Sequence, residues 1–341
     1  MAPHRLPLPD WLRRLETLSP SEINLGLERV AEVLGRMAPE TPARIILVGG
    51  TNGKGSSVEM LRALLSGDNV VGTYTSPHII RYNERIAVNG LPATDEDIVI
   101  AFERVEAARN DVPLTYFEFG TLAALAVFDA ATVDTAILEV GLGGRLDAVN
   151  VVDPDASLIT NVSLDHCEWL GDNVEKIGFE KAGIMRPGRP AVFADPDMPA
   201  SVASHAELLG AELLRAGRDY TWTTEDNARW SWRGERVELS GLRVPALPGP
   251  IQLQNAAGAL ALVEALGLDR LLEPTHVNRA FGSLRLPGRM QVIEDGQRWL
   301  LDVAHNPAAA AALAAGLQQG KAPATVAIVG ILDDKDVEGI I

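Results

Sequence analysis

A glycine-rich segment with a lysine and a serine, Gly49-Gly50-Thr51-Asn52-Gly53-Lys54-Gly55-Ser56, has the composition of a loop that binds nucleotide phosphates. Glycines let backbone N–H groups turn toward phosphate oxygens, and a following helix adds the positive end of its dipole. Lys54 is placed to reach the β- and γ-phosphates, and Ser56 to lie near Mg²⁺. The match to G-x-x-x-x-G-K-[ST] is imperfect, because Val48 replaces the first glycine and Gly55 precedes the serine. A glycine-rich turn without a ligand is the alternative, and the strand–loop–helix context favours phosphate binding.

Three polar residues that could bind a metal, Ser76, Glu139 and His166, each lie at the end of a predicted strand or in the loop after it. The carboxyl ends of parallel strands meet at one crevice, where ligands bind. Imidazole is a more usual ligand for zinc or copper than for magnesium. From the residue types alone, His166 as a loop histidine and Glu139 as a strand-end charge therefore remain open. Lys181, taken by itself, is predicted to be a surface lysine that pairs with a neighbour.

The elements that must position these residues alternate between short apolar strands and helices. This pattern predicts a mostly parallel sheet covered on both faces. Thr94 is a plausible N-cap for one of the helices, and residues 77–92 are expected to form a long polar loop. The predicted strands are 43–48, 70–74, 133–140 and 156–161, and the predicted helices are 24–37, 57–65, 95–108, 118–131 and 252–266.

The pattern changes in the last third of the chain. Residues 220–239 alternate in polarity and contain three tryptophans, which indicates a small antiparallel hairpin added to the main fold. Leu286-Pro287-Gly288-Arg289 is predicted to be a linker between a domain of residues 1–285 and a second domain of residues 290–341. The second domain is expected to contain strands 290–294 and 298–302, joined by Asp295-Gly296, then helix 307–318 and strand 325–329.

The ordered motifs resemble those of one family, the folylpolyglutamate synthase/dihydrofolate synthase branch of the Mur ligase superfamily. GTNGKGS is similar to the family's phosphate loop, and the resemblance covers nearly the whole chain. It implies a P-loop Mur-ligase-like central domain with a mostly parallel sheet, followed by a smaller Rossmann-like C-terminal domain. The other motifs, in family order, are TSPH (75–78), ERI (84–86), TYFE (115–118), LEVGLGGRLDAVN (138–150), LDH (164–166), EKAGIMRPG (180–188), QNAA (254–257), LPGRM (286–290) and DVAHNP (302–307).

The resemblance also implies roles for particular residues. The residues implied to bind ATP are Thr51, Asn52, Gly53, Lys54, Gly55, Ser56, Asn255, Arg289 and Asp302. The residues implied to bind folate are Asn24, Leu25, Gly26, Thr115, Tyr116, Phe117, Glu118, Leu146, Asp147 and Ala148. The implied metal ligands are Ser76, Glu139, His166 and a carbamylated Lys181, holding two Mg²⁺ ions. The implied catalytic residues are Lys54, Lys181 and His305, and His305 forms the glutamate site with Asn306.

Several of these positions keep an alternative interpretation. Asn24 stands where close relatives are expected to have aspartate, which puts one pterin contact in doubt. Tyr116 and Phe117 could equally be core residues at the start of a helix. Asp302 and His305 could cap the helix that begins near Pro307.

The activity that the resemblance implies is ATP-dependent amide ligation. The enzyme would phosphorylate the carboxylate of dihydropteroate, tetrahydrofolate or both, and L-glutamate would then attack the acyl phosphate. Another Mur-type ligase, such as a peptidoglycan-precursor amino-acid ligase, is the nearest alternative. A P-loop switch or a folate-binding protein without ligase activity is an alternative from a different class. The motifs do not distinguish the two acids or set the polyglutamate length.

The composition of the chain restricts the kinds of binding partner that we expect. The formal net charge is −16, which disfavours nucleic-acid binding. Cys167 is the only cysteine, and neither a signal peptide nor a run of about 18 apolar residues stands out. A cytoplasmic monomer with small-molecule substrates is expected. Because the family usually continues beyond the motif at 330–336, the C-terminal domain is expected to be incomplete here.

Overall fold

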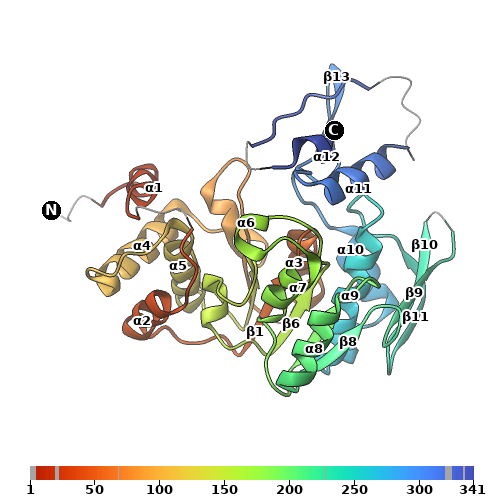
Figure 1. The fold of residues 1–341 in the computed structure, drawn as a ribbon, viewed down its shortest axis with the longest axis horizontal. Helices are drawn as coiled ribbons and strands as arrows, with labels where there is room; N and C mark the ends of the chain where they lie inside the picture. The colour runs from red at the N-terminus through yellow and green to blue at the C-terminus, as the bar shows by residue number, and fades with distance from the viewer. Residues whose placement is uncertain (1–4, 20–22, 68, 227, 319–324, 333–334) are drawn as a thin grey trace.

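A mixed sheet lies at the centre of the molecule, which a computed structural model describes over residues 5–19, 23–67, 69–226, 228–318, 325–332 and 335–341 (Figure 1). Within these residues the sheet has eight strands in the order β4-β3-β2-β5-β1-β6-β7-β8. Six strands run parallel, while β3 and β4 are antiparallel at one edge. The strands are β1 (Arg44–Gly49), β2 (Val71–Tyr74), β3 (Ile86–Val88), β4 (Leu91–Pro92), β5 (Thr135–Glu139), β6 (Ala156–Ile159), β7 (Pro190–Phe193) and β8 (Glu212–Arg215).

The central strands are apolar runs because both faces of the sheet are covered by helices. All of β5 and nearly all of β1 are buried, as a parallel sheet between two helical layers requires. One layer consists of α1 (Leu8–Glu16), α2 (Glu28–Met37), α4 (Asp95–Arg109), α5 (Tyr116–Ala130), α7 (Val174–Ala182) and α8 (Ala200–Leu209). The other consists of α3 (Lys54–Leu65), α9 (Gln252–Ala265) and α10 (Pro274–Gly282). The predicted mostly parallel α/β fold is confirmed.

The prediction of a long polar loop over residues 77–92 is wrong. The segment contains a 3-10 helix, η1 (Tyr82–Arg85), and the short strands β3 and β4. Asn89 and Gly90 have φ angles of 52° and 77°, the left-handed pair that a tight hairpin turn favours. The Asn-Gly signal was present in the sequence, but the strands on either side are too short to show a clear alternation. The predicted N-cap at Thr94 is confirmed, because its side chain accepts a hydrogen bond from the Asp97 amide.

The predicted antiparallel insertion is confirmed and has a third strand. Its strands are β9 (Thr221–Thr224), β10 (Arg229–Arg233) and β11 (Glu238–Arg243), in the order β11-β10-β9. Trp230 and Trp232 on β10 are buried against the helix layer that contains α9. The buried carboxylate of Glu264 on α9 accepts hydrogen bonds from three successive amides, at residues 235–237, and so fixes the turn between β10 and β11.

The last part of the chain is a small unit beside the main body (Figure 1). It contains an antiparallel pair, β12 (Gln291–Asp295) and β13 (Gln297–Leu301), then α11 (Pro307–Gln318) and α12 (Val337–Ile340). The predicted strands and helix are confirmed, but the predicted strand at 325–329 is wrong. No described strand pairs with those residues, and Val326 is 90% exposed. In the described part of the chain, no helix is long and apolar enough to cross a membrane.

Candidate functional site

The glycine-rich segment forms the turn between β1 and α3, as the sequence predicts. Its amides are held by the loop that follows β6: the Asn52 amide donates to Asn161 Oδ1 (3.0 Å) and the Thr51 amide to the Asn161 carbonyl (3.0 Å). The hydroxyl of Thr160 donates to the Asn52 carbonyl (2.6 Å). Asn161 and Thr160 were not predicted as site residues, although they directly follow a buried strand.

Two glycines of this turn cannot be replaced without strain. Gly50 has φ of 138°, and a Cβ there would collide with the side chain of Thr160. Gly53, the N-cap of α3, has φ of 85°, and a Cβ would lie 2.7 Å from Asn255 Oδ1. The tight turn leaves the first amides of α3 without helical acceptors, which is the usual arrangement of an anion-binding helix start.

Two lysines meet at the carbonyl of Gly50. Lys54 Nζ donates to it at 3.2 Å, and Lys181 Nζ, from the last turn of α7, donates to it at 3.0 Å. Lys181 is only 4% exposed. Burial, reinforced by the charge of Lys54, lowers the pKa of Lys181 from its ordinary value to about 7. The prediction of a surface lysine from the residue pattern alone is therefore wrong, and a large fraction of Lys181 is neutral near pH 7.

The predicted metal ligands Ser76, Glu139 and His166 all line the same cavity as the phosphate loop. Glu139 is buried and accepts a hydrogen bond from the Ser76 amide at 3.2 Å. Burial raises the pKa of Glu139, against the opposing charge of Lys54. Burial also lowers the pKa of His166, which keeps its imidazole neutral and able to coordinate. The described residues contain no cluster of three or more His, Cys, Asp or Glu side chains arranged to hold a metal by themselves.

The predicted nucleotide residues outside the loop reach the cavity from two directions. Asn255 on α9 is fully buried behind Gly53, and among the described residues its Oδ1 has no hydrogen-bond partner. Gln252, which the sequence did not single out, accepts from Asn255 Nδ2 (3.2 Å) and donates to Ser56 Oγ (3.4 Å). Arg289 and Asp302 line the cavity from the C-terminal side.

Asp302 and the residues after it shape the start of the C-terminal unit. Asp302 accepts hydrogen bonds from the amides of Met290 and Ala304, both at 2.8 Å, and so ties β12 to the segment after β13. Asn306 caps α11, because its Oδ1 accepts from the Ala309 amide at 2.9 Å. Capping is thus carried by Asn306, while the exposed His305 lines the cavity.

The three predicted folate segments are joined to one another by hydrogen bonds. The Gly26 amide donates to the Leu146 carbonyl at 3.3 Å. Arg29 donates to the Asn24 carbonyl (2.7 Å) and to the buried carboxylate of Glu118 (2.6 Å). A single arginine from α2, absent from the sequence prediction, therefore joins two of the segments.

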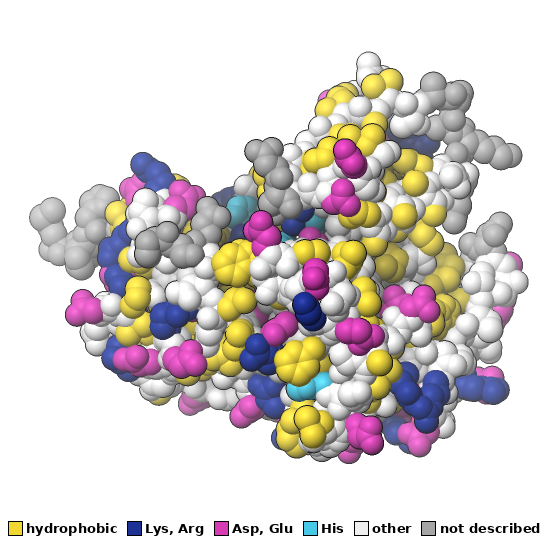
Figure 2. Space-filling model, viewed as in Figure 1, with side chains coloured by type: hydrophobic (Ala, Val, Ile, Leu, Met, Phe, Trp, Pro, Cys, Tyr) yellow, Lys and Arg dark blue, Asp and Glu magenta, His cyan; other side chains and the backbone are white. Residues whose placement is uncertain are grey.

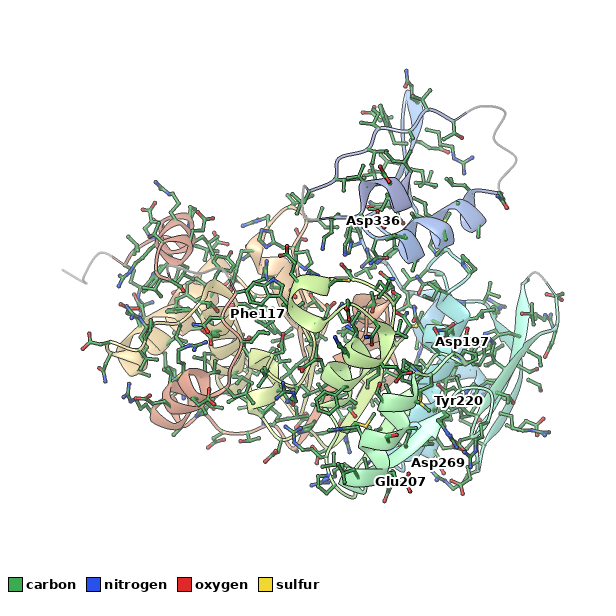
Figure 3. All side chains as sticks on the ribbon, viewed as in Figure 1. Phe117, Asp197, Glu207, Tyr220, Asp269 and Asp336 are labelled. Atoms are coloured by element: carbon green, nitrogen blue, oxygen red, sulfur yellow. The ribbon has the colours of Figure 1, made fainter. Side chains whose placement is uncertain are left out.

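The start of α5 connects these segments to the cavity. Thr115 caps α5, and the Glu118 carboxylate accepts from the Thr115 amide at 2.7 Å. Phe117, labelled in Figure 3, packs so closely on Gly141 that a Cβ there would lie 2.7 Å from its ring, and Gly141 lines the cavity. Tyr116 and Phe117 are half-buried, so neither is a fully enclosed core residue. Burial raises the pKa of Asp147 to about 6.

A cavity of about 650 Å³ joins the phosphate loop, the ends of β2 and β5, and the C-terminal unit. Figure 2 shows a hollow between the main body and the C-terminal unit, with basic and histidine side chains visible inside it. The cavity is lined by Lys54 and Lys181 from the main body and by Arg289 from the linker. Such a site suits a polyphosphate beside a second, smaller anion.

The chain is similar to known protein families and to individual proteins, and these similarities agree with one another. Residues 48–263 match the Mur ligase middle domain family, and residues 288–341 match the Mur ligase glutamate ligase domain family. The chain is 42% identical over 336 residues to the dihydrofolate synthase/folylpolyglutamate synthase of Escherichia coli (strain K12), covering 98% of this chain and 78% of that protein.

Two solved structures are also similar. The structure of E. coli FolC in complex with DHPP and ADP has a TM-score of 0.93 and 40% identity, covering 98% of this chain and 80% of that one. A bifunctional folylpolyglutamate synthase/dihydrofolate synthase with Mn, AMPPNP and L-glutamate bound has a TM-score of 0.85 and 44% identity, covering 94% of this chain and 76% of that one.

Proposed function

The chain belongs to the dihydrofolate synthase/folylpolyglutamate synthase family of Mur ligases, and from this premise we propose how its own residues carry out glutamate ligation. The enzyme is an ATP-dependent ligase that adds L-glutamate to a folate-type carboxylate, in folate synthesis and polyglutamylation. The observation that carries the proposal is the single cavity in which the phosphate loop, Glu139, Arg289 and His305 face one another.

The residues at the ends of β2 and β5 suit a divalent metal. Glu139 is a buried carboxylate beside Ser76, and the neutral His166 lines the same cavity. These donors do not close a coordination shell, which leaves room for phosphate oxygens, as Mg²⁺ sites in ATP-dependent enzymes usually require. Ser76, Glu139 and His166 would hold the ion. When bound, it would neutralise phosphate charge and orient the transferring group.

Nucleotide binding is assigned to the loop and to the residues around it. The amides of residues 51–56 and Lys54 hold the phosphates, with Asn255, Arg289 and Asp302 completing the site. The unpartnered Asn255 Oδ1 supports this assignment, because a buried acceptor without a donor is costly until a ligand supplies one. Lys54 and Arg289 offset the negative charge that develops during phosphoryl transfer.

The folate-type acid is assigned to the grouped segments 24–26, 115–118 and 146–148. From there its carboxylate reaches the cavity past Gly141 and attacks the γ-phosphorus of ATP. An acyl phosphate forms and ADP leaves. The amine of L-glutamate, held near His305 and Asn306, then attacks the acyl carbon and releases phosphate. The walls of the cavity shield the acyl phosphate from part of the surrounding water.

Lys181 is assigned as a carbamate. Carbon dioxide adds only to a neutral amine, and a buried lysine beside Lys54 with a pKa of about 7 supplies one. Carbamylation replaces a buried cation with an anionic oxygen group, which also removes the repulsion between the two lysines at the Gly50 carbonyl. The carbamate would complete a site for a second Mg²⁺ ion.

The remaining assignments concern the domains of the chain, its binding partners and its location in the cell. Residues 1–285 form the ATP- and folate-binding domain, residues 286–289 the linker, and residues 290–341 the part of the ligase that approaches glutamate. The proposed partners are small molecules only, and the net charge of −16 supports the exclusion of nucleic acids. A cytoplasmic monomer is proposed, and the single cysteine supports a reducing compartment.

Product analysis tests the proposed function. The protein is incubated with ATP, Mg²⁺ and radiolabelled L-glutamate, with either dihydropteroate or tetrahydrofolate as the acid. Labelled amide is expected with at least one of them, and the ratio between the two acids establishes the substrate preference. A protein that binds folate but does not ligate would give no labelled product with either acid.

A further inference from the structure

We infer that Asp165 is a positioning residue for the amide-forming step, because it fastens the C-terminal unit against the phosphate loop. The inference rests on the proposed ligase function. It concerns a carboxylate to which neither the motifs nor the mechanism above assigns a role. Four side chains from distant parts of the sequence meet at or beside it: Asn52, His305, Asn306 and Lys335.

The Asp165 carboxylate accepts from two groups of the C-terminal unit. Its Oδ2 accepts from Asn306 Nδ2 at 3.0 Å, and its Oδ1 accepts from Lys335 Nζ at 3.3 Å. The Asp165 and Lys335 side chains are only 9% and 10% exposed. His305 Nε2 lies 3.7 Å from Oδ2. One carboxylate from the loop after β6 thus contacts the start of α11 and the segment just before α12.

Asn306 extends the connection to the phosphate loop. Its Nδ2 also donates to Asn52 Oδ1 at 3.0 Å, and its Oδ1 accepts from Asn52 Nδ2 at 3.2 Å. Asn306 is 2% exposed and also caps α11. The start of α11, the phosphate loop and Asp165 therefore share one side chain, and moving any of them disturbs the other two.

This arrangement matters most after phosphoryl transfer. The acyl phosphate must meet the glutamate amine before it meets water, so the unit that carries His305 has to remain in place. Lys335 lies just before α12, and Asp336, labelled in Figure 3, begins that helix. A salt bridge with little exposure at this point holds the end of the unit without touching the nucleotide loop itself.

The test uses Lys335, because it contacts Asp165 without belonging to the phosphate or metal site. Lys335→Met removes the ion pair, Lys335→Arg retains it, and Arg298→Met is the matched control. Arg298 is an exposed cation on β13 in the same unit, so its replacement makes the same change in charge. The measurements are amide formed per ATP consumed, KM for glutamate, and ADP affinity by calorimetry.

We expect Lys335→Met to raise the KM for glutamate about tenfold and to lower the amide formed per ATP, while ADP affinity changes less than twofold. Lys335→Arg should restore coupling, and Arg298→Met should match the wild type. In a double-mutant cycle, Asp165→Asn alone should lower coupling at least as much as Lys335→Met, because it also weakens the Asn306 contact, and the two effects should be less than additive. Normal coupling in Lys335→Met, or a uniform loss in all three measurements, would overturn the inference. A wild type that forms no amide would instead overturn the proposed function.

Discussion

The two lysines at the Gly50 carbonyl define the chemistry of the site at the scale of single residues. Both donate to one oxygen, so their charges repel, and burial adds to the cost of protonating Lys181. The cost is avoided if Lys181 is neutral or becomes an anion. The carbamate assignment uses this same property, since it needs an amine that loses its proton near neutral pH.

Carbamylation should therefore depend on pH in a defined direction. Below its pKa of about 7 Lys181 is protonated and unreactive, and above it the neutral amine can bind carbon dioxide. Incubation with ¹³C-labelled bicarbonate should give a carbamate signal by NMR that grows between pH 6 and pH 8. Lys181→Ala should lack the signal and lose ligase activity, with partial rescue by short carboxylic acids. An identical signal in the wild type and in Lys181→Ala would contradict the assignment.

The phosphate and metal assignments can be separated from folate binding. Lys54→Ala and His166→Ala should each abolish ligation, because they remove charge neutralisation and a metal ligand respectively. Neither residue belongs to the segments grouped by Arg29, so binding of dihydropteroate should survive. Binding is followed by fluorescence titration, and turnover by product analysis. Near-normal turnover in either variant would refute the role of that residue.

At the scale of single residues, the sequence indicated which residues could do chemistry but not how buried they are or which residues surround them. The assignment of Lys54 and Ser56 to a phosphate loop follows from local spacing, and in the structure both residues lie in the first turn of α3 and line the cavity. The burial of Lys181 depends on α7 packing against the loop, 131 residues away from Gly50 along the chain. Asp165 lies in the LDH motif, but the sequence assigned it no role because its partners come from distant segments.

At the scale of elements, two helix starts offer a matched comparison. Thr94 and Thr115 each cap a helix with a capping box, at α4 and α5 respectively. Replacing either with alanine should cost about 1 kcal/mol of stability, measured by urea unfolding. Only Thr115→Ala should also raise the KM for the folate-type acid, because Glu118 in its capping box contacts Arg29. An equal KM effect in both variants would remove α5 from the folate site.

The sequence predicted best those elements whose own residues show a clear hydrophobic pattern. β1 and β5 each have an apolar centre, and helix 307–318 is confirmed at the predicted residues. The strand predicted at 325–329 failed because its apolar residues have no neighbouring strand within the described residues. β3 and β4 were missed because a strand of two or three residues carries almost no periodicity, although Asn89-Gly90 marked their turn.

At the scale of the whole molecule, function depends on two parts that meet across one cavity. The main body supplies the phosphate loop and the ends of β2 and β5, the linker supplies Arg289, and the C-terminal unit supplies Asp302 and His305. The resemblance of the motifs to those of the family predicted that both parts of the chain contribute residues to the site. Their contact through Asp165 and Asn306 emerged only from the fold, since it joins residues up to 254 positions apart.

The central claim is that ATP is consumed to join glutamate to a folate-type acid. The most direct test measures ADP release by the whole chain with ATP and Mg²⁺, in the presence of each substrate alone and of both together. Sustained ADP release is expected only with both the acid and L-glutamate, at one ADP for each amide bond formed. Full-rate ADP release without glutamate would contradict the account.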